Sequence, residues 1–177
     1  MTRQNRYSIA AVVLLSFAAT MSGHQAFGQS LKEQLVGTWT LTNLYAVTWD
    51  EDDRNPFGAA PEGRMIFERD GTVTCLIIGT GRPKFALGDR LAGTPEENMA
   101  AVQSTQAFYG TYSVDEDNRT VVFHVERSAF PNWDGSSQVS VMTINGDTLD
   151  QSKAGPRASW GYAVWERVLG RKVALSD

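Results

Sequence analysis

Apolar and polar residues alternate along most of the chain, which is the pattern of half-buried β-strands. Turn signals separate these stretches at short intervals. Asp70-Gly71 and Asn145-Gly146-Asp147 mark hairpins, because these residue types tolerate the positive φ of tight turns. The pattern predicts about eight strands, over residues 35–46, 64–69, 72–78, 106–114, 119–128, 138–144, 148–151 and 159–168.

A different pattern begins at Thr94 and predicts the one helix. Thr94 suits the N-cap, Pro95 suits the first helical position, and Glu97 completes a capping box. We expect this helix to end near Thr105. A closed barrel suits the strand count better than a sandwich, because closure removes exposed strand edges. The predicted fold class is therefore all-β, an antiparallel barrel of about eight strands with one helix.

The first 28 residues have the features of a cleavable signal peptide. Arg3 and Arg6 precede a short apolar run, Ile9 to Phe17, and Ala26-Phe27-Gly28 offers small residues for cleavage. The run is shorter than the roughly 20 apolar residues that span a bilayer. We expect cleavage near Gly28 and a periplasmic or secreted protein without membrane insertion; an uncleaved membrane anchor is the alternative.

The remaining residues, 29–177, have the length of one domain. The whole chain carries 16 basic and 20 acidic residues, and its formal net charge is −4. This acidic balance argues against nucleic-acid partners and anionic membrane surfaces, because both require clustered positive charge. Cys75 is the only cysteine, so no internal disulfide can form, and we expect it to be a buried, inert thiol.

Two short motifs carry a resemblance to known proteins. Gly37-Thr38-Trp39 near the first strand and Trp165-Glu166-Arg167 on the last resemble paired motifs of lipocalins and other calycins. The resemblance implies that Arg167 packs across the Trp39 ring and closes one end of the barrel. A planar cation over an aromatic face is a favourable contact, so the implied role of both residues is structural.

The chain is similar more specifically to the bacterial and fungal lipocalin-like domain family. That resemblance implies a small calycin-type barrel with a helix over its mouth, and it implies no settled activity. The motifs that carry it run through most of the chain: Leu35-Val36-Gly37-Thr38-Trp39, Pro61 and Gly63, Asp70-Gly71, residues 85–97, Gly110-x-Tyr112, His124-Val125-Glu126-x-Ser128, Pro131-Asn132-Trp133 and Trp165-Glu166-Arg167.

This sequence departs from the family pattern at three positions. The family often has paired histidines where this chain has Phe123-His124, an arginine near Ser140, and a tyrosine at Phe108. These differences imply a less polar pocket than is usual for the family. They also weaken the case for a shared acid–base mechanism.

The orientation of the strand over residues 119–128 is open to two interpretations. Alternation puts His124 and Glu126 on one face and Val121, Phe123 and Val125 on the other. Simple patterning would turn the apolar face inward. The resemblance favours the opposite, because its shared residues are the polar ones, and we expect His124 and Glu126 inside the barrel.

An inward His124 has two possible roles. It could be a core histidine with a hydrogen-bond partner such as Glu126, Ser128 or a tyrosine. It could instead be a general base whose tautomer Glu126 holds, since imidazole titrates near neutral pH. A single imidazole predicts no metal site, and we expect no cofactor.

Aromatic residues occur on nearly every predicted strand, and we expect some of them to line an apolar pocket. An eight-stranded barrel has room for side chains or for one small ligand. Buried tyrosines need polar partners and therefore suit the pocket wall. The predicted ligand contacts are Tyr45, Phe67, Phe108, Tyr112, His124, Glu126, Ser128, Trp133 and Tyr162.

Three functions are compatible with these features. The first is binding of a small, mostly apolar or aromatic molecule inside the barrel. The second is a cofactor-independent isomerase, cyclase or lyase with His124 and Glu126 as acid and base. The third is a packed barrel with a structural or interaction role, which a cavity well below the few hundred Å³ of typical ligand sites would favour.

Overall fold

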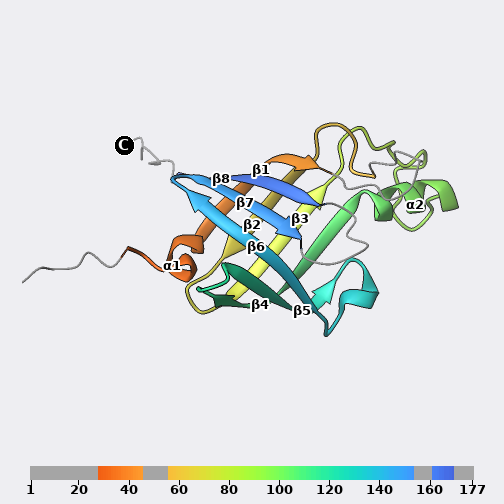
Figure 1. The fold of residues 1–177 in the computed structure, drawn as a ribbon. Coiled ribbons are helices and arrows are strands. Elements are labelled where there is room, and N and C mark those ends of the chain that lie inside the picture. The colour runs from red at the N-terminus through yellow and green to blue at the C-terminus, as the bar shows by residue number, and fades with distance from the viewer. Residues whose placement is uncertain (1–27, 46–55, 154–160, 170–177) are drawn as a thin grey trace, which may run out of the picture.

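Eight antiparallel strands close into a barrel because each pairs with its neighbour in sequence and the last pairs with the first (Figure 1). The computed structural model describes residues 28–45, 56–153 and 161–169. The predicted all-β barrel is confirmed over these residues. The strands are β1 (Gly37–Tyr45), β2 (Glu62–Phe67), β3 (Thr72–Ile78), β4 (Thr105–Asp115), β5 (Thr120–Ser128), β6 (Ser137–Asn145), β7 (Thr148–Lys153) and β8 (Tyr162–Arg167).

Within the described residues, three short helical segments accompany the strands. They are α1 (Leu31–Leu35), α2 (Pro95–Gln103) and the 3-10 turn η1 (Pro131–Trp133). Figure 1 shows α1 at one end of the barrel and α2 at the other. No helix among the described residues has the length and apolar character needed to cross a membrane. The predicted signal peptide lies outside the described residues, except for Gly28.

The core follows directly from the alternation in the sequence. On β3, Val73, Cys75 and Ile77 are buried, whereas Thr74 and Leu76 between them are exposed. Successive side chains point to opposite faces of a sheet, and this period of two is interrupted on β1 by a bulge between Leu41 and Asn43. Cys75 is buried, as predicted.

The helix α1 plugs one end of the barrel and was not predicted from the sequence. We predicted a strand from Leu35, but the strand begins at Gly37, and residues 31–35 are helical. Ser30 caps this helix together with Glu33, and Leu31 and Leu35 are buried. The Glu116 carboxylate accepts from the backbone N–H of Leu31 at 2.7 Å, which ties the plug to the turn after β4.

Arg167 locks this closed end by stacking on Trp39, as the calycin resemblance implied. Its guanidinium carbon lies 4.2 Å from the centroid of the Trp39 ring. The same guanidinium donates hydrogen bonds to the carbonyls of Gln34 at 2.7 Å and Val36 at 3.1 Å. The Trp39 indole donates to the Leu35 carbonyl at 2.8 Å. One cation thus joins the last strand, the first strand and α1.

The helix α2 has the predicted capping box. Thr94 Oγ1 accepts from the Glu97 N–H, and the Glu97 carboxylate accepts from the N–H groups of Thr94 and Ala86. The hydrogen bonds from Thr94 and Ala86 lower the pKa of Glu97, because they favour its charged form. No residue of α2 is buried, so it stands at the rim of the barrel end opposite α1 and does not plug it.

Replacing Arg167 with alanine should lower the free energy of unfolding by about 3 kcal/mol, because a cation–π contact and two hydrogen bonds are lost. Arg167→Lys should recover only part of the lost free energy of unfolding, since an ammonium lacks the planar set of N–H donors of a guanidinium. Urea unfolding measures both variants. Arg64→Ala on the exposed face of β2 is the control, with an expected change below about 0.5 kcal/mol. Wild-type stability in Arg167→Ala would contradict the proposed lock.

Gly110 sits at a β-bulge where β4 and β5 approach closely, and it should not tolerate any side chain. An added Cβ would lie 2.0 Å from the carbonyl oxygen of His124, which is fixed in the ladder. Gly110→Ala should therefore destabilise the fold by about 3 kcal/mol or leave it unfolded. Thermal unfolding compared with Thr111→Ala, an exposed neighbour, tests this. Equal melting temperatures for the two variants would refute the argument.

Candidate functional site

Polar side chains enter the barrel interior towards the end opposite α1. Gln106 on β4, Ser140 on β6 and Gln151 on β7 are buried, and Gln138 on β6 is half-buried. Among the described residues, they share a cavity of about 10 Å³, room for about one water molecule. The other residues that line it are Cys75, Phe108, Phe123 and Trp133.

Two of these polar side chains, Gln151 and Ser140, form a hydrogen-bonded chain with the indole of Trp165. The Trp165 indole N–H donates to Gln151 Oε1 at 3.0 Å. Gln151 Nε2 in turn donates to Ser140 Oγ at 3.0 Å. Both bonds are buried, which matters because an unpaired amide in the interior would be costly. The chain fixes the orientation of the amide and of the hydroxyl that faces the cavity.

The cavity carries no charged side chain among its described lining residues. Its polar groups are amides, a hydroxyl and a thiol. Such groups can orient a neutral polar molecule through hydrogen bonds. They offer no countercharge for a buried ion, whose transfer from water is expensive without one.

Trp133 forms the outer end of an aromatic wall. Its ring lies edge-on to Phe108 at 6.3 Å and to Phe130 at 5.9 Å between centroids. Phe108 in turn meets Phe123 at 5.5 Å. Trp133 is half-buried, whereas Phe108 and Phe123 are buried. The wall therefore runs from the interior of β4 and β5 to the turn that follows β5.

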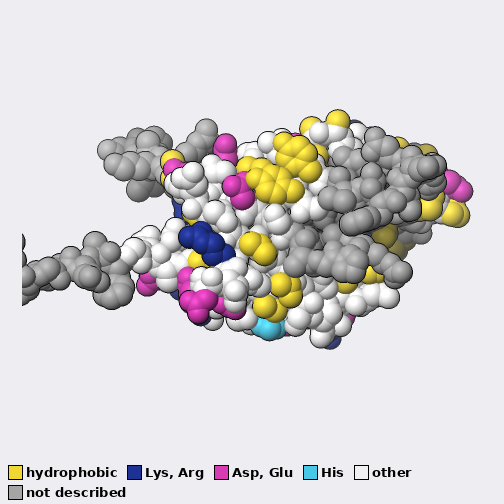
Figure 2. Space-filling model, viewed as in Figure 1, with side chains coloured by type: hydrophobic (Ala, Val, Ile, Leu, Met, Phe, Trp, Pro, Cys, Tyr) yellow, Lys and Arg dark blue, Asp and Glu magenta, His cyan; other side chains and the backbone are white. Residues whose placement is uncertain are grey.

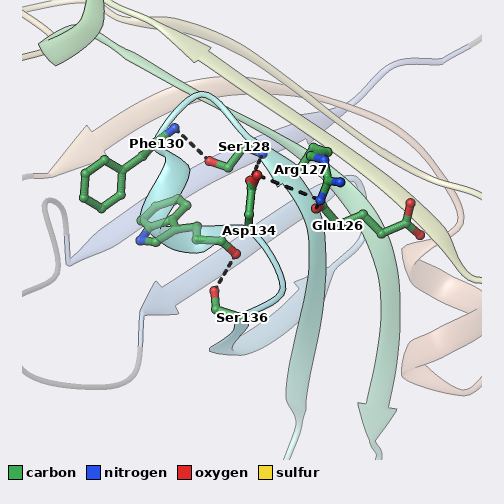
Figure 3. Close-up of polar contacts among 7 residues, drawn as sticks. Glu126, Arg127, Ser128, Phe130, Asp134 and Ser136 are labelled. Carbon is green, nitrogen blue, oxygen red and sulfur yellow. Dashed lines mark hydrogen bonds and ion pairs between the residues drawn. The ribbon is translucent and has the colours of Figure 1, made fainter.

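A set of local hydrogen bonds builds the turn that carries Trp133 (Figure 3). The Asp134 carboxylate accepts from the Ser128 N–H at 2.8 Å, and Ser128 Oγ accepts from the Phe130 N–H at 3.0 Å. Ser136 Oγ donates to the Trp133 carbonyl at 2.8 Å. These contacts hold the backbone of the turn while the indole itself makes edge contacts. Ser128, predicted as a ligand contact, supports this turn through its backbone N–H and its hydroxyl.

The prediction that His124 and Glu126 face the interior is wrong. Both are exposed, and Val121, Phe123 and Val125 are the buried residues of β5. Figure 2 shows the histidine at the surface near β4 and β5. The apolar face turns inward because burying it removes far more apolar area from water than the polar face could. Simple alternation is therefore the correct guide to this strand.

The hydrogen-bond partners of His124 are serines on the neighbouring strands. Its Nε2 lies 3.0 Å from Ser113 Oγ on β4, and its Nδ1 lies 3.2 Å from Ser137 Oγ on β6. The predicted pairing with Glu126 is not among the hydrogen bonds of the described residues. From the outer face, neither side chain can act on a molecule held in the interior cavity.

Tyr45 and Tyr162 lie together on the outside of the barrel. Their rings are 5.7 Å apart, and Tyr45 is 54% exposed. The Tyr162 hydroxyl donates to the Asp150 carboxylate, and this bond raises the pKa of Tyr162. Figure 2 shows hydrophobic side chains gathered on this flank, over β1 and β8. Neither tyrosine lines the interior cavity, and their predicted contact with a ligand stays a prediction.

Phe67 and Tyr112 belong to the packed core and do not line the cavity. Their rings meet edge-on at 4.9 Å between centroids. The Tyr112 hydroxyl donates to the Glu68 carbonyl at 3.2 Å, and burial raises the pKa of this phenol. Of the nine predicted contacts, Phe108 and Trp133 are the two that line the interior cavity.

The polar residues of the site were not predicted from the sequence. Gln106, Gln138 and Gln151 entered only as members of predicted strands, and Ser140 entered only as the position near which the family often has an arginine. A signal was present on β6, where Gln138 and Ser140 share one face with the apolar Met142 and Ile144. Polar residues in register with an apolar face can mark the point where the core ends and a pocket begins.

Comparison with known proteins agrees with this architecture. The sequence model of the lipocalin-like domain matches residues 36–168. The chain belongs to this lipocalin-like family. It is also 33% identical over 107 residues to the 4'-hydroxy-3'-methoxypropiophenone carrier protein of Aspergillus oryzae, an alignment that covers 57% of this chain and 96% of that protein. The lipocalin-like barrel and this carrier relative indicate small-molecule binding.

Across residues 28–45, 56–153 and 161–169, no group of three or more histidine, cysteine or acidic side chains could hold an ion. The interior of this lipocalin-like barrel offers amides, a hydroxyl and aromatic rings. Its chemistry is therefore that of hydrogen bonding and apolar contact.

Replacing His124 with alanine should leave the interior unchanged, because its two hydrogen bonds lie on the outer face. We expect a loss of stability of about 1 kcal/mol or less. In amide NMR spectra, shifts should centre on Ser113 and Ser137, while the indole N–H signals of Trp133 and Trp165 stay in place. Movement of the Trp165 signal would show that His124 communicates with the cavity and would contradict this placement.

Proposed function

We propose that this protein is an exported carrier that holds a small, mostly apolar aromatic molecule inside the barrel. The observation that carries the proposal is the interior site itself, in which an aromatic wall faces a fixed chain of uncharged polar groups. Aromatic side chains supply burial, and a few oriented polar groups supply specificity, which is the usual composition of a small-molecule site.

The carrier relative supports an aromatic ligand. The compound in its name has a benzene ring with hydroxyl, methoxy and ketone oxygens, all uncharged. A ring of this kind suits the buried rings of Phe108 and Phe123, which line the cavity. Its oxygens suit the amides and the hydroxyl of Gln106, Ser140 and Gln151, although the ligand of this chain need not be the same compound.

Binding requires a side chain to move, because the cavity of about 10 Å³ is far below the several hundred Å³ of typical ligand sites. Trp133 is the side chain best placed to move. It is half-buried, sits on a three-residue turn and makes edge contacts with its aromatic neighbours. We propose that the indole occupies the position of the ligand ring in the free protein and that a ligand displaces it.

Titration with aryl ketones should quench the intrinsic tryptophan fluorescence in a saturable way. Trp133→Ala vacates the proposed ring position and should speed association about tenfold in stopped-flow experiments, because no side chain has to be displaced first. Tyr45→Ala, on the outer face, should bind as the wild type does. Slower association in Trp133→Ala would show that the indole is a wall of the site and not a plug.

The carrier function can be tested separately from the proposed displacement of Trp133. Native mass spectrometry and fluorescence should both detect a complex with members of a panel of aryl ketones, phenols and aryl ethers. If no member binds by either method, the carrier proposal is wrong. The packed-barrel alternative, with a structural or interaction role, would then account for the small cavity.

Export is the second part of the proposal and rests on the N-terminal sequence. Residues 1–28 combine two arginines, a short apolar run and small residues before the expected cleavage point. Expression of the full chain in a Gram-negative host should deliver a protein that begins near Gln29 to the periplasm or medium. Intact mass measurement of each fraction checks this, and full-length protein confined to the cytoplasm would contradict it.

A further inference from the structure

We propose that the Ser140 hydroxyl is a directed hydrogen-bond donor, and that the site therefore selects neutral ligands with a carbonyl or ether oxygen over carboxylates and plain hydrocarbons. This inference rests on the proposed carrier function and names the ligand chemistry of the same site. It follows from the direction of three hydrogen-bonding groups inside the barrel.

Trp165 sets the donor-to-acceptor direction of this hydrogen-bonded chain. This side chain is fully buried, and its indole nitrogen can only donate. It donates to Gln151 Oε1 at 3.0 Å, so the oxygen of the amide must face the indole. The reverse orientation would place two N–H donors against each other in the interior. The amide of Gln151 therefore has one permitted orientation.

The orientation of Gln151 then determines what Ser140 can do. Gln151 Nε2 faces Ser140 and donates to its Oγ at 3.0 Å. One lone pair of the hydroxyl is used, and the hydroxyl proton must point away from that N–H. Ser140 is 2% exposed, so the direction left to this proton is not bulk water. Ser140 lines the cavity, and its proton is available to an acceptor there.

The described residues that line the cavity include no charged side chain, and this explains the selection for neutral ligands. A ketone or ether oxygen accepts one hydrogen bond from Ser140 and carries no net charge into the interior. A carboxylate would enter a cavity whose described lining residues include no cation, and its lost hydration would not be repaid. A hydrocarbon would leave the Ser140 donor without an acceptor, which is also unfavourable.

Three ligands of similar size test the selection, namely propiophenone, propylbenzene and 3-phenylpropanoate. The wild type should bind propiophenone most tightly in a calorimetric or fluorescence titration. Ser140→Ala should lower the affinity for propiophenone about fivefold, which is the scale of one hydrogen bond. The affinity for propylbenzene should stay within about twofold of the wild-type value. Val141→Ala, the outward-facing neighbour, should bind all three ligands as the wild type does.

An infrared measurement on the wild type tests whether Ser140 donates a hydrogen bond to the ligand, and this measurement needs no variant. The carbonyl stretch of propiophenone bound to the wild type should lie at lower frequency than in an apolar solvent, because a donated hydrogen bond weakens the C=O bond. Ser140→Ala should return the band to the apolar position. A bound ketone with an unshifted band in the wild type would overturn the inference.

The outcomes separate this inference from the carrier function. Ser140→Ala could weaken binding of the ketone and of the hydrocarbon equally, or leave both affinities unchanged. Either result would show that Ser140 is not a directed donor, while the carrier function would stand. Tighter binding of 3-phenylpropanoate than of propiophenone would likewise overturn the selection for neutral ligands. If the wild type binds none of the three ligands or the wider aromatic panel, the carrier function itself fails, and the inference fails with it.

Discussion

The pairing of β8 with β1 is the contact on which the rest of this structure depends. It brings together segments that lie 131 residues apart in the chain, as in the hydrogen bond from Arg167 to the Val36 carbonyl. Without this pairing, the sheet would expose two edges and its interior would be open to water. Arg167 reinforces the pairing, since one side chain covers the Trp39 ring and satisfies two carbonyls at the plugged end.

Closure divides the interior into two regions with different chemistry. Towards α1, large apolar side chains such as Trp39, Phe67 and Leu35 fill the barrel. Towards the other end, Gln106, Ser140 and Gln151 take inward positions, and each polar group needs a partner because water is excluded. The apolar region supplies stability, and the polar region supplies a place where a ligand could be oriented. An eight-stranded barrel is just wide enough for both.

The small cavity and the aromatic wall have one physical explanation under the carrier proposal. An empty apolar space of ligand size would forfeit dispersion contacts in the free protein. The half-buried indole of Trp133 fills this space, and the turn that carries it is held by its own hydrogen bonds. The free protein is then well packed, and the ligand exchanges one aromatic ring for another.

The sequence by itself determined the strands, the hairpin turns, the capping box of α2 and the stacking of Arg167 on Trp39, because these follow from local alternation, turn chemistry and a recognisable motif. Alternation also indicated the inward face of β5 correctly, and the resemblance that pointed His124 inward was misleading. The helix α1 was not predicted, because its five residues are too few to show a periodic pattern. Only the tertiary structure decided the site. Trp165, Gln151 and Ser140 stand on three successive strands, and the register between neighbouring strands brings the donors and acceptors within bonding distance.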